Sequence, residues 1–342
     1  MRDCSVHFKD IIVDRSFRPA DSRFISDACG PVADLMLNFS VIICAHNPRR
    51  DYLQRVLDAL KAQTVPKDEW ELLLIDNGSR QPMAPEWDLS WHPLGRVIRE
   101  DELGLTPARL RGIRESRGAL LVWVDDDNVL HSDYLAEASK IAGAYPFIGA
   151  WGGRILAEFD VPPALNDVPF LRYLAIRDVE EVVWVNTIDF YKTVPWGAGM
   201  CIRPAVANEY LSLVTRDPRR RILDRKGELI FAGGDSDMAL CARRLGMGMG
   251  LFPSLKLAHL ISEDRLRKGF LVRAAFGSGY TITLLNYLYG IRTTPEKHGL
   301  LRRGITFARL LGRSRLERQL AAEERNGVSA AWKLIQRWEK PR

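Results

Sequence analysis

The sequence lacks the short motifs that identify several common enzyme classes. No G-x-G-x-x-G follows the first predicted strand, no G-x-x-x-x-G-K-[ST] occurs, and no G-x-S-x-G follows any predicted strand. Dinucleotide-dependent dehydrogenases, P-loop NTPases and serine hydrolases are therefore disfavoured. The five cysteines are odd in number and include no C-x-x-C pair, so they predict buried, reduced thiols rather than disulfides or a zinc site.

A clean apolar run of membrane-spanning length is also missing. The nearest candidate, Ala274–Ile291, is interrupted by glycine, serine, threonine and asparagine, which favours a buried helix. The N-terminus shows no basic segment followed by an apolar run and a cleavage site. We therefore expect a cytoplasmic protein.

Positive charge is concentrated at one end of the chain. Residues 302–342 contain 11 Lys and Arg against 4 Asp and Glu, which leaves residues 1–301 close to neutral. A near-neutral body argues against a broad nucleic-acid-binding face, so no nucleic acid partner is expected. The remaining composition, 46% hydrophobic and 27% charged over 342 residues, is typical of a soluble globular protein of one large domain or two.

Three short apolar runs predict strands that are covered on both faces. They span residues 39–45, 70–75 and 119–124. Apolar residues between 53 and 60 have amphipathic helical spacing, and a second helix is expected to begin with Thr106 as its N-cap. This alternation predicts a doubly wound α/β sheet, in which ligands bind at the carboxyl ends of the strands.

Three consecutive carboxylates follow the third predicted strand. Asp125, Asp126 and Asp127 would repel one another unless a cation compensates, and hard oxygen ligands select Mg²⁺ or Mn²⁺. In extended backbone, Asp125 and Asp127 face the same side, so this pair could share a metal and phosphate site. A solvated acidic turn, or a capping cluster for a helix near Ser132, is the alternative.

A second acidic element opens a predicted helix. Asp235 and Asp237 follow Gly233 and Gly234 and precede an apolar helical segment. Carboxylates at a helix N-terminus are stabilised by the macrodipole, so capping alone explains them. The alternative is a general base, which the glycines would leave open to substrate.

Six segments in this order resemble the inverting family 2 glycosyltransferases of the GT-A fold. The resemblance runs from about Phe39 to Arg273 and is carried by FSVIICAHNPRRDYLQRVLDAL, LLLIDNGS, LGLTPARLRGI, VWVDDDN, PWGAGMCIRP and GGDSDMALCARRLGM. It implies a GT-A type α/β fold, a Rossmann-like doubly wound mixed sheet with a helical C-terminal extension. The implied divisions are an extension over 1–38, a transferase domain over 39–280 with a nucleotide-binding half (39–130) and an acceptor-binding half (131–280), and a basic helical extension over 281–342.

The resemblance also implies roles for particular residues. The donor nucleotide and its phosphates would be contacted by Ala45, His46, Asn47, Asp76, Arg109, Asp125 and Asp126. Asp127 would ligate Mn²⁺ or Mg²⁺, and His259 resembles a downstream histidine that could approach the same ion. For Arg109 an exposed helical arginine, and for His259 a structural histidine, are the alternatives.

Asp235 matches the catalytic base of the family. It would deprotonate an acceptor hydroxyl that attacks the anomeric carbon opposite the departing nucleoside diphosphate. The family usually has a glutamate before this base, whereas this sequence has Gly234. Asp237 is a candidate to share the work of the base.

The implied function is a metal-dependent inverting glycosyltransferase of polysaccharide or glycoconjugate biosynthesis. Its donor would be a UDP-, GDP- or dTDP-linked sugar, and its acceptor a saccharide or lipid-linked hydroxyl. Two alternatives are a non-catalytic nucleotide-sugar-binding or scaffold protein and a sugar nucleotidyltransferase. The basic C-terminal region could attach to the inner face of the membrane, or its Trp332, Ile335 and Trp338 could dock on the catalytic domain.

Overall fold

The computed structural model describes residues 37–163, 170–187, 193–224, 233–291, 294–295 and 314–340. All of these residues belong to one unit, Met36–Arg342. The expected extension over residues 1–38 lies almost wholly outside the described residues.

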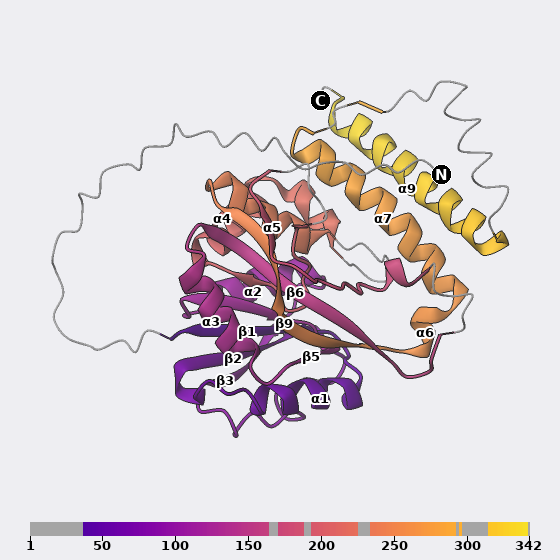
Figure 1. Cartoon of the computed structure of the whole chain (residues 1–342). Helices are drawn as coiled ribbons and strands as arrows, with labels where there is room; N and C mark the ends of the chain where they lie inside the picture. The colour runs from indigo at the N-terminus through magenta and orange to yellow at the C-terminus, as the bar shows by residue number, and fades with distance from the viewer. Residues whose placement is uncertain are drawn as a thin grey trace, which may run out of the picture. The chain divides into compact units, whose positions relative to one another are not determined.

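A mixed sheet forms the centre of this unit (Figure 1). Its strands in the described residues are β1 (Phe39–Ala45), β2 (Trp70–Asn77), β3 (Gly95–Glu100), β4 (Leu120–Val124), β5 (Asn128–Leu130), β6 (Ile148–Phe159), β7 (Val183–Val185), β8 (Cys201–Ile202) and β9 (Gly248–Ile261). The order is β3-β2-β1-β4-β8-β6-β9-β5, with β7 also paired to β9. The pairs β3–β2, β2–β1 and β1–β4 are parallel, so their carboxyl ends meet at one edge.

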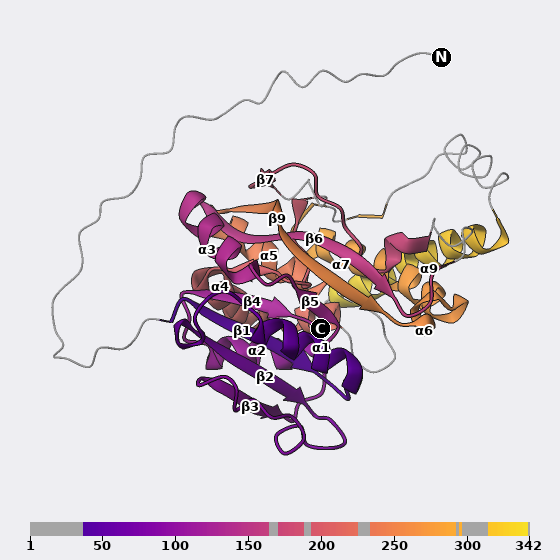
Figure 2. The same ribbon diagram turned by 60° about the horizontal axis from the view of Figure 1, so that its bottom comes forward.

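The second half of the sheet contains both parallel and antiparallel strand pairs. β8 is antiparallel to both β4 and β6, while β6 and β9 run parallel as two long neighbours (Figure 2). β5 and β7 pair antiparallel with β9. Because β5 directly follows the aspartates that end β4, its pairing with β9 brings two distant segments to the same place.

Helices cover both faces of the sheet. They are α1 (Arg50–Lys61), α2 (Leu105–Glu115), α3 (Tyr134–Ala144), α4 (Pro204–Arg216), α5 (Gly234–Arg244), α6 (Glu263–Leu266), α7 (Lys268–Leu288) and α9 (Arg315–Trp338), with 3-10 helices η1 (Lys67–Glu69) and η4 (Pro218–Leu223). Side chains alternate along β1, so Val41 and Ile43 pack in one core with α1 and α3, and Ile42 packs in the other with α2, α4 and α5. β1, β2 and β4 are thus buried on both faces.

The helices α7 and α9 pack side by side (Figure 1). Trp332 and Ile335 of α9 are buried in this contact, and Trp338 packs against it. These residues therefore pack on α7, while docking on a catalytic domain as such stays a prediction. The arginines between residues 302 and 313 lie outside the described residues. None of the described helices is both long and apolar enough to cross a bilayer.

The structure confirms the predicted α/β sheet with helices on both faces and a helical segment after it. One local prediction was wrong: α2 begins after Gly104, so Thr106 lies inside the helix rather than capping it. Its hydroxyl instead bonds Asp224, as described below.

β3 was not predicted, because its half-buried sequence GRVIRE is too charged to read as a buried strand. The boundary expected after residue 280 falls within α7.

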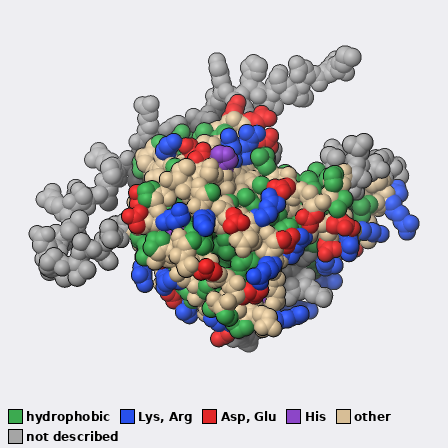
Figure 3. All heavy atoms as spheres, turned by 90° about the horizontal axis from the view of Figure 1, so that it is seen from below, with side chains coloured by type: hydrophobic (Ala, Val, Ile, Leu, Met, Phe, Trp, Pro, Cys, Tyr) green, Lys and Arg blue, Asp and Glu red, His purple; other side chains and the backbone are tan. Residues whose placement is uncertain are grey.

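The surface seen in Figure 3 mixes acidic and basic side chains. Lysines and arginines lie beside aspartates and glutamates across this face, without a large area of one sign. Such interspersed charge is ordinary for the solvated surface of a globular protein.

Candidate active site

The turns after β1 and β2 are joined at the carboxyl edge of the sheet. Ala45 pairs in register with Asp76, and the backbone N–H of Asn47 donates to the Ser79 hydroxyl at 3.0 Å. Asn47 has a φ of 47°, a left-handed conformation that asparagine tolerates better than most residues. The turns are therefore braced before any ligand arrives.

His46 is oriented by two hydrogen bonds. Its Nδ1 lies 2.7 Å from the carbonyl oxygen of Asn77, and its Nε2 lies 2.8 Å from the side-chain nitrogen of Asn47. The carbonyl requires a donor and the amide nitrogen requires an acceptor, so the ring carries its hydrogen on Nδ1. The ring thereby connects the two turns.

Asp76 is buried beneath the second turn. Its carboxylate accepts from the backbone N–H groups of Ser79 and Met83 at 2.9 and 3.1 Å, and from Arg99 at 2.8 Å. Burial acts to raise the pKa of Asp76, but Arg99 and the backbone donors outweigh it and hold the pKa below its ordinary value. The carboxylate is ionised and shapes the loop; contact with a nucleotide stays a prediction.

The aspartates after β4 lie in a tight turn between β4 and β5. The backbone N–H of Asp125 bonds the Asn128 side chain at 3.2 Å, and Asn128 in turn donates to Asp127 Oδ1 at 3.0 Å. Asp127 is buried, whereas Asp125 and Asp126 are partly exposed. The fold therefore buries the Asp127 carboxylate and holds it by a hydrogen bond from Asn128.

Asp127 and His259, the two metal ligands that the resemblance implies, lie close together; their binding of a metal stays a prediction. β5 pairs Asn128 with His259, and His259 Nε2 comes within 3.5 Å of Asp127 Oδ2. Arg265, at α6, lies against both: it donates to Asp127 Oδ2 at 2.5 Å, and its other terminal nitrogen is 2.8 Å from His259 Nε2. A guanidinium therefore holds the position between the two predicted ligands.

The donor atoms of Asp127 and His259 fit a divalent cation in chemistry. A carboxylate oxygen and an imidazole nitrogen are ligands that Mn²⁺ accepts. Among the described residues, no group of three or more His, Cys, Asp or Glu is arranged to hold a metal ion. A cation here would need further oxygen ligands from a substrate, and Arg265 would have to leave Asp127.

Asp235 is fixed at the start of α5. Its Oδ2 accepts from the backbone N–H of Gly197 and its Oδ1 from the backbone N–H of Ser236, both at 2.7 Å. The side chain remains partly exposed. A carboxylate held by two donors, with one face open, has the setting expected of a general base.

Arg109 lies behind Asp235, not on the surface. It is only 5% exposed, and a Cβ on Gly197 would lie 2.9 Å from its terminal NH2 nitrogen and 3.3 Å from Asp235 Cβ. Its other terminal nitrogen donates to both oxygens of Asp224 at 2.9 and 3.0 Å. The alternative of an exposed helical arginine is thus wrong, and contact of Arg109 with the donor stays a prediction.

Asp237 cannot share the role of the base. It is completely buried, pairs with Arg220 and accepts from the Tyr289 hydroxyl at 2.8 Å. Burial raises the pKa of Asp237 to about 6, although Arg220 acts in the opposite direction. Because two residues along a helix point to different faces, Asp235 faces the site and Asp237 the core.

Sequence reasoning missed Arg265, Asp224 and Gly197. Arg265 could have been suspected from its place six residues after His259, but nothing local marks it as a partner of Asp127. Asp224 carries no signal at all, because its partner Arg109 is 115 residues away. Gly197 was noted only as part of a glycine-rich segment, and its N–H is what holds Asp235.

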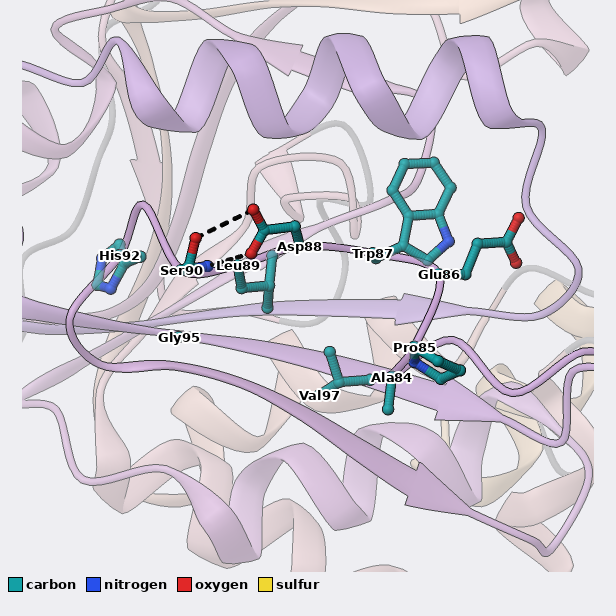
Figure 4. Close-up of a pocket in the computed structure, with 10 residues that line it drawn as sticks. All are labelled: Ala84, Pro85, Glu86, Trp87, Asp88, Leu89, Ser90, His92, Gly95 and Val97. Atoms are coloured by element: carbon teal, nitrogen blue, oxygen red, sulfur yellow. Dashed lines mark hydrogen bonds between the residues drawn. The ribbon is translucent and has the colours of Figure 1, made fainter.

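A separate hollow lies beside β3 (Figure 4). Its walls are formed by residues between Ala84 and His92 together with Gly95 and Val97, and Asp88 in it bonds the backbone and hydroxyl of Ser90. None of the predicted site residues lines it. The candidate site is therefore the carboxyl edge of the sheet, not this hollow.

Known proteins match the first half of this chain. Residues 40–175 match the family described as Glycosyl transferase family 2. Glycosyltransferase AglE of Haloferax volcanii is 34% identical over 127 residues, and EpsH of Bacillus subtilis is 26% identical over 106 residues. These alignments cover 36% and 30% of this chain, and only 40% and 30% of the length of the two relatives.

Solved structures give more distant likenesses. S. aureus TarS 1–349 in complex with UDP has a TM-score of 0.45 at 13% identity, over 90% of this chain and 93% of that one. GalNAc-T7 with UDP, GalNAc and Mn²⁺ has a TM-score of 0.47 at 16% identity, over 73% of this chain and 51% of that one. The family match spans β1 to β6 and includes the aspartates after β4. Residues 40–175 of this chain are thus similar to glycosyl transferase family 2.

Proposed function

We propose that the protein is a metal-dependent inverting glycosyltransferase that moves a sugar from a nucleotide-diphosphate sugar to an acceptor hydroxyl. One observation carries the proposal: Asp235 is fixed by the Gly197 N–H beside Arg109. Arg109 in turn is within electrostatic reach of both Asp235 and Asp125. A candidate base and the aspartate turn thus share the carboxyl edge of the sheet, where α/β proteins bind ligands.

Asp235 acts as general base in this proposal. Its Oδ2, oriented by Gly197, takes the proton from the acceptor hydroxyl as that oxygen attacks the anomeric carbon from the face opposite the leaving group. Such proton transfer contributes roughly 10²–10⁴ in rate. A single displacement from the opposite face inverts the configuration of the sugar.

Asp127 and His259 would hold the cation, and Arg265, which contacts Asp127 in this structure, would turn to the donor phosphates. A bound Mn²⁺ or Mg²⁺ supplies positive charge that stabilises the departing diphosphate. Arg265 adds a second positive charge that is already positioned at the same carboxylate. The donor nucleotide, UDP, GDP or dTDP, lies along the turns of Ala45 to Asn47 and of Asp76, with Asp125 and Asp126 near its ribose or sugar.

The acceptor is a saccharide or lipid-linked hydroxyl, and the product belongs to polysaccharide or glycoconjugate synthesis at the cytoplasmic side of the membrane. Burial of Trp332 and Ile335 against α7 removes those two side chains from membrane contact. Any surface attachment would therefore rest on exposed arginines such as Arg315 and Arg318.

Isothermal titration with UDP, GDP and dTDP, each with and without Mn²⁺, tests the proposal. One nucleotide should bind in a Mn²⁺-dependent manner, and Asp127→Ala should weaken that binding at least about tenfold. Asp133→Ala is the matched control, since Asp133 is an exposed carboxylate on the following turn that pairs with His131. Equal binding by wild type and Asp127→Ala, or no binding of any nucleotide, would reject this function.

A further inference from the structure

The carboxylate of Asp224 occupies the space where a side chain at position 234 would begin. A Cβ on Gly234 would lie 2.2 and 2.4 Å from the two carboxylate oxygens of Asp224 and 2.3 Å from its Cγ. Asp224 directly follows η4, whereas Gly234 is the first residue of α5. Glycine at 234 is therefore required for Asp224 to reach its position.

Asp224 is held there entirely by polar contacts within the core. Its exposed fraction is 3%, and it accepts two bonds from Arg109 and one from the Thr106 hydroxyl at 2.9 Å. Arg109 and Thr106 are also buried, and both lie on α2. The burial of Arg109 disfavours its charge, and Asp224 is the largest of the effects that restore it and raise the pKa of Arg109. A buried charge pair of this kind is costly to break, because removal of one partner leaves the other uncompensated.

The second terminal nitrogen of Arg109 faces the candidate base. It lies against Gly197, whose N–H donates to Asp235, and both Arg109 and Arg177 interact electrostatically with Asp235. Arg177 is anchored separately, by stacking on Trp196 with 3.5 Å between the guanidinium carbon and the ring centroid. The position of Arg109, by contrast, depends on Asp224.

We propose that Asp224 is a positioning residue for the reaction: through Arg109 it fixes Gly197 and Asp235, and it supplies from η4 the carboxylate that residue 234 itself lacks. This inference rests on the proposed function, since it assigns Asp224 a part in the same site. It gives the glycine before the base a physical reason: any side chain at 234 would collide with the carboxylate that performs this task.

The inference is tested by the effect of Gly234→Asp, which should be harmful in the wild-type background and beneficial in the Asp224→Ala background. Gly234→Asp in the wild-type background adds a second carboxylate within contact of the first, which should lower the Tm and the rate. In the Asp224→Ala background the same change should be beneficial, because the new aspartate fills the vacated space and pairs with Arg109. Position 234 opens a helix, where aspartate is well tolerated.

The rate is measured as release of nucleoside diphosphate from UDP-, GDP- and dTDP-glucose with Mn²⁺. Asp224→Asn, which keeps the shape of the side chain, should lower kcat on the order of 10²-fold with KM changed less than about threefold. The kcat of the double variant Asp224→Ala/Gly234→Asp should be at least about tenfold higher than the kcat of Asp224→Ala. Asp217→Asn is the control, because Asp217 is another carboxylate of the η4 region that pairs with a surface arginine, Arg219.

The melting temperature separates this inference from the proposed function. If wild type binds none of the nucleotides in the titration described above, the proposed function fails. The melting temperatures of wild type, Gly234→Asp, Asp224→Ala and the double variant still show whether residues 224 and 234 share one carboxylate site. If Gly234→Asp is equally harmful in both backgrounds, the shared site is refuted. If Asp224→Asn keeps wild-type kcat while wild type is active, the positioning role is refuted.

Discussion

Arg265 donates a hydrogen bond to Asp127 Oδ2 at 2.5 Å while its other terminal nitrogen lies 2.8 Å from His259 Nε2. One guanidinium thus contacts both residues that the sequence predicted as metal ligands. The charge of the arginine compensates Asp127 in the free protein, as a cation would in the complex. Arg265 therefore occupies the carboxylate oxygen that a divalent ion at this position would need.

Removal of Arg265 should strengthen the binding of Mn²⁺ alone. In Arg265→Met the Asp127 carboxylate and His259 lose their competitor, so the affinity for Mn²⁺ without nucleotide should rise roughly tenfold, measured by calorimetric titration. Arg267→Met is the matched control, since Arg267 is exposed and pairs with Glu263 and Asp264 on its own helix. Weaker or unchanged Mn²⁺ binding by Arg265→Met would show that the two do not compete.

Asp235→Asn should abolish catalysis without weakening nucleotide binding. The amide cannot accept a proton, so the release of nucleoside diphosphate should fall roughly 10²–10⁴-fold. The Kd for the nucleotide should change less than about twofold, because Asp235 is expected on the acceptor side. Asp88→Asn, beside the hollow of Figure 4, serves as the control. A parallel loss of binding and rate would instead place Asp235 on the donor.

The pH dependence of stability should differ between wild type and Asp237→Asn. The pKa of Asp237, about 6 in the folded protein, exceeds the ordinary value of 3.8, because burial outweighs Arg220 and Tyr289. Between those values the folded state keeps a proton that the unfolded state releases, so this group's contribution to stability falls as pH rises. Relative to wild type, Asp237→Asn should gain up to about 3 kcal/mol between pH 4 and pH 7. Urea unfolding across this range measures the difference; the opposite trend would mean that Arg220 outweighs burial.

Alanine at Gly279 should separate α7 from α9. A Cβ there would lie 2.1 Å from the backbone carbonyl oxygen of Glu324, which cannot rotate away. We expect a loss of about 1–3 kcal/mol in the free energy of unfolding. Gly143→Ala, at an exposed position of α3 where a Cβ would meet nothing within 4 Å, should gain about 0.5–1 kcal/mol. Comparable effects at both positions would show that close helix packing is not the cause.

The sequence alone determined most of the strands and helices in the first half of the fold. β1, β2 and β4 are largely apolar runs, since a strand buried on both faces leaves few positions for polar side chains. The helical spacing of its leucines predicts α1. The ends of these apolar runs also located the aspartate turn and Asp235 at the ends of elements. β3 escaped prediction because an edge strand is half exposed and admits charge.

Only the tertiary structure decided which of these polar groups act together. The pairing of β5 with β9 brings His259 to Asp127, and the fold carries Asp224 from η4 to Arg109 on α2. Asp235 and Asp237 are alike in sequence, yet one faces the site and the other the core because a helix turns about 100° per residue. Short-range patterns encode exposure and backbone conformation, whereas the partner of a buried charge is set by contacts between distant segments.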